Sequence, residues 1–166
     1  FHADLHFNLN EVYTTHKKVI EVNQKKIRIT IPAGVGNGQV IKLKGYGGQG
    51  INGGPSGDLY IKFIIHNNTS FTRIKEDLYK SINIDLSNEM LGGEVTIDTL
   101  SEKVKVKIVH GTQNGAKLRL KGKGFPVYNK EGEFGDLIIT INVALPTNLS
   151  DREKDLIGEL ADIRNK

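Results

Sequence analysis

Five histidines are the side chains in this sequence best suited to bind a metal or to move a proton. They are His2, His6, His16, His66 and His110. Only His2 and His6 are close together, and on a β-strand that spacing places both on one face. Neither has a neighbouring acidic or histidine pair to complete a ligand set. We interpret these histidines as solvated surface residues and expect no metal site.

Two other patterns resemble functional sites, a phosphate-binding loop and a catalytic carboxylate pair, but neither is complete. The glycine-rich stretch 45–50 resembles a phosphate-binding loop, but it lacks Gly-Lys-Ser/Thr and precedes a predicted strand, not a helix. We interpret it as a flexible connection. Asp58 and Asp136 each follow a glycine, and a pair of carboxylates could do acid–base work. They stand in separate repeats, so we interpret each as a turn residue at the start of a strand.

The composition narrows the class of protein further. No cysteine is present, which excludes disulfides, thiolate catalysis and cysteine-ligated zinc, and fits a reducing, cytoplasmic location. No Ser-His-Asp spacing or nucleophile elbow occurs, and no carboxylate pair suggests a carbohydrate-processing enzyme. We therefore expect a protein without enzymatic activity or cofactor. The net charge of +4 is spread along the chain and does not itself indicate nucleic acid.

An internal duplication organises the chain. Gly34, Gly38 and Gly45 recur as Gly111, Gly115 and Gly122, each 77 residues later (111 − 34 = 77). The stretch 57–59 then recurs at 135–137 after one inserted residue. No apolar run approaches the ~18 residues that span a membrane. The chain begins at Phe1, so we expect a part of a longer protein, with no signal peptide visible.

Alternation of apolar and polar residues predicts a mainly β fold. It is clearest at 26–31 and 103–108, whereas 58–66 and 136–144 are more continuously apolar and are predicted to be central strands. The stretches 9–15 and 86–91 are each short enough for a helical turn. Ser150 and Glu153 form a capping box, which predicts a helix from Asp151 to Arg164. Its apolar face contains Leu156, Ile157, Leu160 and Ile163.

The motifs together resemble the carboxy-terminal client-binding region of DnaJ-type J-domain co-chaperones. The resemblance rests on segments 31–47, 57–60, 71–79, 91–95, 121–124 and 135–137, in the same order and spacing. The cysteine repeat that some members insert near residues 22–26 is missing, so the chain resembles the zinc-finger-free type, similar to the curved-DNA-binding relatives. No His-Pro-Asp motif of a J domain is present.

The resemblance implies two tandem homologous β-sandwich modules with short helical turns. They are a client-binding module at 1–74 and a second module at 75–148, followed at 149–166 by a C-terminal helix leading to a dimerisation segment. It also implies binding of unfolded polypeptides, delivery to a DnaK-type chaperone, and a homodimer in the full-length protein. The helix has an alternative role as a cover for the second module.

The resemblance also implies where a client binds. The groove positions it gives are Leu5, Phe7, Ile20, Val22 and Phe71, with Lys18 beside them. The two-residue repeat of a β-strand supports three of these positions, because Lys18, Ile20 and Val22 lie on the same face of one strand. The alternative is that these apolar residues are ordinary core.

The basic residues of the first module suggest two further binding partners. His16, Lys17 and Lys18 could dock the acidic tail of the partner chaperone, or form a solvated turn. The lysines of the first module could instead bind DNA, with an affinity that falls steeply with salt. They are Lys17, Lys18, Lys25, Lys26, Lys42 and Lys44.

Overall fold

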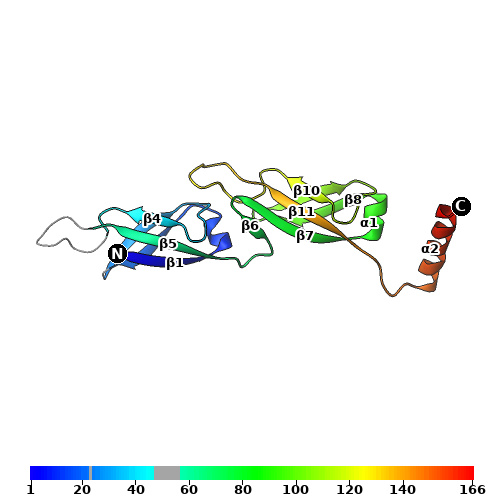
Figure 1. Ribbon diagram of the computed structural model, residues 1–166, viewed down its shortest axis with the longest axis horizontal. Helices are drawn as coiled ribbons and strands as arrows, with labels where there is room; N and C mark the ends of the chain where they lie inside the picture. The colour runs from blue at the N-terminus through cyan, green and yellow to red at the C-terminus, as the bar shows by residue number, and fades with distance from the viewer. Residues whose placement is uncertain (23, 47–56) are drawn as a thin grey trace, which may run out of the picture.

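Two β-sandwiches form the main body of the protein in the computed structural model, which describes residues 1–22, 24–46 and 57–166. The mainly β fold predicted from the sequence is confirmed. Residues 47–50 of the glycine-rich stretch lie outside the described residues. The two sandwiches follow one another along the long axis of an elongated chain, and a separate helix lies at the C-terminal end (Figure 1).

The first sandwich packs a three-stranded sheet against a hairpin. The sheet has the order β1-β5-β4, with β1 (His2–Asn8) parallel to β5 and β4 antiparallel to it. The hairpin pairs β2 with β3. A 3-10 turn, η1 (Leu9–Val12), leads from β1 to β2. The remaining bounds are β2 His16–Val22, β3 Lys25–Ile31, β4 Val40–Leu43 and β5 Leu59–His66.

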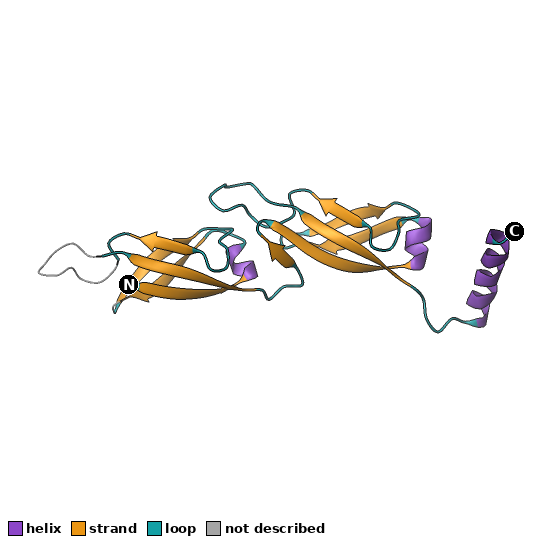
Figure 2. Cartoon of the chain, in the orientation of Figure 1, coloured by secondary structure: helices purple, strands orange, loops and turns teal. Residues whose placement is uncertain are grey.

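The second sandwich repeats this topology and adds one strand. Its sheet has the order β10-β11-β7-β6, with β7 parallel to β11, and its hairpin pairs β8 with β9. A short helix, α1 (Leu86–Leu91), follows β7 as η1 follows β1. The bounds are β6 Thr72–Ile74, β7 Asp77–Asp85, β8 Gly93–Asp98, β9 Lys103–Ile108, β10 Lys117–Leu120 and β11 Leu137–Ala144. Figure 2 shows the two bodies of strands.

The central strands predicted from their continuous apolar character, β5 and β11, are confirmed as interior strands of their sheets. Alternation also holds on β3, where Ile29 and Ile31 are buried while Arg28 and Thr30 are exposed. The expected boundary between residues 74 and 75 falls inside the β6–β7 hairpin, because Ile74 pairs with Asp77.

The two sandwiches meet in a close junction built around Arg73 of β6. Its guanidinium donates hydrogen bonds to the carbonyl oxygens of Val35 (2.7 Å) and Gly34 (2.8 Å) in the first sandwich. It also lies 4.1 Å from the ring centre of Phe125, a buried residue of the second sandwich. Burial lowers the pKa of Arg73, which still stays charged at neutral pH.

The C-terminal helix α2 (Asp151–Arg164) has the predicted bounds and the predicted cap. Ser150 Oγ accepts a hydrogen bond from the Glu153 backbone N–H, and Glu153 Oε1 accepts one from the Ser150 N–H. None of its residues is buried, and its four apolar side chains are between 42% and 72% exposed. None of the helices in the described part of the chain is long and apolar enough to cross a membrane.

Candidate functional site: the opening between β1 and β2

Two strands with unpaired edges lie on the same side of the first sandwich. β1 pairs with β5, and β2 pairs with β3; within the described chain each has no partner on its other edge. Phe7 of β1 contacts two residues of β2, with His16 edge-on to its ring and Lys18 Nζ 4.6 Å from its centre. These contacts pack β1 and β2 against each other at Phe7, and each strand keeps one edge without a strand partner in the described chain.

Half-buried side chains lie at the inward positions of both strands. Ala3 and Leu5 of β1 and Val22 of β2 pack against the core while remaining partly accessible, and Lys18 is also half-buried. The adjacent Val19 points to the other face and is exposed. We call the set Ala3, Leu5, Lys18 and Val22 the β1–β2 opening. It presents apolar surface beside unpaired strand edges, which is the arrangement that accepts an added strand.

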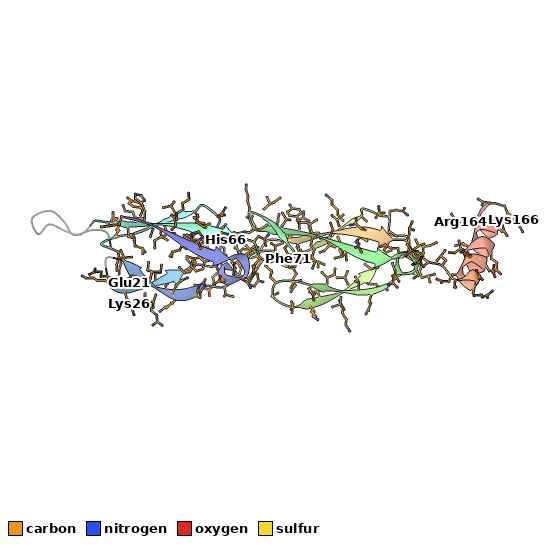
Figure 3. The ribbon with its side chains drawn as sticks, turned by 90° about the horizontal axis from the view of Figure 1, so that it is seen from below. Glu21, Lys26, His66, Phe71, Arg164 and Lys166 are labelled. Atoms are coloured by element: carbon orange, nitrogen blue, oxygen red, sulfur yellow. The ribbon has the colours of Figure 1, made fainter. Side chains whose placement is uncertain are left out.

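The predicted groove residues are only partly brought together. Leu5 and Val22 lie in the opening, whereas Ile20 (8% exposed) and Phe7 (2%) are buried beneath it. Phe71 is 6% exposed and comes just before β6, where its ring lies 4.9 Å from Lys80 Nζ of β7. In Figure 3, Phe71 lies beyond His66, toward the second sandwich and away from the end of the hairpin marked by Glu21 and Lys26.

The basic cluster divides between the two faces of β2. Lys17 is exposed on the outer face. Lys18 points to the inner face and covers the Phe7 ring, while His16 Nδ1 lies 3.1 Å from the Thr14 carbonyl oxygen. Only Lys17 therefore presents an ammonium group that is free of these contacts.

The histidines and carboxylates singled out in the sequence have structural partners. His6 Nδ1 lies 2.9 Å from His66 Nε2, an exposed pair that sequence spacing missed because β1 and β5 are far apart in the chain. His2 stacks on Tyr60. The described residues contain no group of three or more His, Asp or Glu side chains arranged to hold a metal.

Asp58 and Asp136 stabilise equivalent turns, as predicted. Asp58 accepts hydrogen bonds from Lys42 and from the Gly45 backbone N–H, and the Lys42 hydrogen bond is the main reason that its pKa is lowered. Asp136 accepts from the Gly122 N–H and from Arg119 (2.6 Å), and these lower its pKa in that order.

The comparison with protein families decides the relationship. A model of the DnaJ C terminal domain matches residues 1–146. The chain belongs to the DnaJ C-terminal domain family. It is 46% identical over 136 residues to "Chaperone protein DnaJ" of Caldicellulosiruptor bescii. The matched residues make up 82% of this chain and 35% of the relative.

Two further relatives carry the same name. The protein from Bacillus velezensis is 44% identical over 140 residues, covering 84% of this chain and 37% of the relative. The protein from Staphylococcus saprophyticus is 46% identical over 138 residues, covering 83% of this chain and 36% of the relative. The chain thus spans little more than a third of the length of these curated relatives. They are named as chaperones, and none of the three names supports the alternative of DNA binding.

Proposed function

We propose that this chain is a co-chaperone's client-binding part, which binds exposed hydrophobic segments of unfolded proteins and passes them to a DnaK-type chaperone without catalysing a reaction itself. The observation that carries the proposal is the β1–β2 opening. Unpaired strand edges can hydrogen-bond to any extended main chain. The half-buried apolar side chains beside them favour apolar client residues.

Charge and strand length fit this role. β2 has seven residues and offers inward positions at Lys18, Ile20 and Val22, so an added client strand of similar length would span about 23 Å. The Lys18 ammonium group at the rim disfavours cationic client residues. Main-chain pairing with apolar side-chain contacts reads hydrophobicity and not a particular sequence, as a chaperone requires.

The experiment measures aggregation of a chemically denatured model protein after dilution, with and without this chain. The variant Leu5→Ser/Val22→Ser changes only half-buried positions, so it should remain folded by circular dichroism. Val19→Ser is the matched control, because it makes the same valine-to-serine change on the opposite, exposed face of β2. We expect protection by the parent and the control, and at least a fivefold loss in the double variant.

Two outcomes would count against the proposal. If the folded double variant protects as well as the parent, the β1–β2 opening does not bind clients. If Val19→Ser loses as much protection as the double variant, the effect is not specific to the inward face. Phe71→Ser is measured separately, because the Phe71 ring lies against Lys80 of β7, and a selective loss there would place the client nearer to the junction.

We further propose that Lys17 contributes to docking of an acidic tail of the partner chaperone, with His16 and Lys18 beside it. The support is its exposed ammonium group at the start of β2. Lys17→Gln should weaken binding of an acidic peptide more than Lys25→Gln, and binding should fall with salt. Equal effects of both changes would leave only non-specific attraction. We also propose that the full-length protein forms a homodimer through the region to which α2 leads.

A further inference from the structure

Two histidines of the first sandwich form a pair that client binding does not use. His6 lies on β1, and His66 ends β5, next to the connection to the second sandwich (Figure 3). Both side chains are exposed on the outer face of the sheet, whereas the neighbouring Leu5 and Phe7 point inward. His6 Nδ1 lies 2.9 Å from His66 Nε2. The pair is therefore open to solvent and separate from the β1–β2 opening.

The two imidazole rings meet nitrogen to nitrogen. Their centres are 5.2 Å apart and their planes differ by 10°. The separation of the centres exceeds that of the nitrogens by one ring diameter, so both nitrogens lie on the line that joins the centres. One nitrogen donates a proton and the other accepts it. Both become free to bind a metal when that proton moves to the far nitrogen of its own ring, which is the other neutral tautomer.

The spacing of the two nitrogens favours one coordination geometry. Bonds from a metal ion to imidazole are about 2.0–2.1 Å long, so two bound nitrogens lie about 2.8–3.0 Å apart at 90° and about 3.3–3.4 Å apart in a tetrahedron. The observed 2.9 Å matches the 90° arrangement, which is found in the square-planar and tetragonal sites of Cu(II) and Ni(II). Turning the exposed rings toward one ion costs little, because χ2 of histidine is broad.

We propose that His6 and His66 chelate a Cu(II) or Ni(II) ion in adjacent coordination positions. The described residues hold no third His, Asp or Glu grouped with them, so water or a small chelating molecule supplies the remaining ligands. Asp4 and Lys62 are register partners next to the pair on the two strands. Their opposite charges offset one another, so these neighbours do not repel a cation.

The site exists only in the folded chain. His6 and His66 are 60 residues apart in the sequence, and the parallel pairing of β1 with β5 brings them together. An ion that binds both ties the edge strand β1 to its sheet and stabilises the fold, because it binds the folded form in preference to the unfolded one. The ion would lie on the outer face and leave the inward side chains of β1 unobstructed. The inference therefore does not depend on client binding.

The experiment titrates the chain with Cu(II) by isothermal titration calorimetry and counts the bound imidazoles by electron spin echo envelope modulation. We expect two imidazoles on the ion in the parent and one in His6→Ala or His66→Ala, with at least a tenfold loss of affinity in each variant. Both side chains are exposed, so circular dichroism should show that the variants are folded. His110→Ala is the matched control, because it removes an exposed histidine of the second sandwich, and it should change neither value.

His2→Ala tests a competing site, because His2 follows the amine of Phe1 and nitrogen ligands of both kinds bind copper. A loss of affinity in His2→Ala that exceeds the loss in His6→Ala would overturn the proposal and place the ion at Phe1. Equal affinities of the parent and His6→Ala would overturn it as well. Thermal unfolding is an independent measurement: Cu(II) should raise the unfolding temperature of the parent and of His110→Ala, and a similar rise in His66→Ala would contradict binding at the pair.

Discussion

Gly34 allows the two sandwiches to approach closely, and its replacement by alanine should loosen the junction. A Cβ atom at Gly34 would lie 2.5 Å from the Pro126 carbonyl oxygen and 2.9 Å from the Tyr128 nitrogen. Relief to an ordinary C···O contact requires a separation of about 0.9 Å. The Arg73 hydrogen bonds to Gly34 and Val35, now 2.8 and 2.7 Å long, would then exceed the range of a hydrogen bond.

The magnitude follows from those two bonds. Each has a charged donor and contributes about 1.5–3 kcal/mol, so we expect a loss of about 3–6 kcal/mol from the junction. The backbone adds about 1–2 kcal/mol, because φ is +88° at Gly34 and L-residues resist that region. Gly111→Ala is the matched control, with φ of +79° at the repeat-equivalent position and open space around the added Cβ.

The assay is urea unfolding of the parent and both alanine variants, followed by circular dichroism. Gly111→Ala should lose only the backbone contribution. Gly34→Ala should lose about 3–6 kcal/mol more, and its transition should broaden as the sandwiches unfold separately. Equal losses in the two variants would refute the reasoning, because they would mean that the packing of Pro126 on Gly34 does not hold the sandwiches together.

Three further changes test other contacts. The pKa of Asp136 is lowered in the fold, so its contribution to stability is present at neutral pH and is lost as pH falls through the folded pKa. Asp136→Asn should therefore flatten the acid side of a plot of unfolding temperature against pH. An unchanged slope would contradict this. Ser150→Ala should destabilise α2 by about 1 kcal/mol and lower the helical signal at 222 nm, whereas Ser87→Ala should not. Phe125→Ala should destabilise the chain by about 3–5 kcal/mol in urea, because the ring is buried between Tyr13 and Arg73; a loss below 1 kcal/mol would mean that the junction repacks around the gap.

The sequence predicted what depends on local pattern. Alternation predicted β3 and β9, the capping box predicted the start of α2 and its apolar periodicity the extent, and the offset of 77 predicted the common topology of the sandwiches. The strands and the helix are set by neighbours a few residues apart, and the common topology follows from the repeat itself. The parallel pairing of β1 with β5 and the His6–His66 contact join segments that no local pattern connects.

The site was harder to predict because burial depends on both faces of a sandwich. Ile20 and Val22 share a strand face, yet one is buried and the other lines the opening, since only the edge is accessible. The Phe71 ring lies against the Lys80 ammonium group, across the boundary expected from the repeat. Glu89 had a signal that went unused: it aligns with Val12, and a glutamate at a core position of the repeat indicates a buried polar side chain.

The Arg73 junction has a mechanical consequence. Its guanidinium is held on one side by the β6–β7 hairpin, where its Nε–H also donates to the Lys75 carbonyl, and on the other side by the loop carbonyls of the first sandwich. Bending between the sandwiches must break both inter-sandwich hydrogen bonds and lift the guanidinium from Phe125 at once. The two sandwiches therefore move as one rigid unit. A force applied to a strand at the β1–β2 opening is transmitted to the second sandwich, because no hinge between them absorbs it.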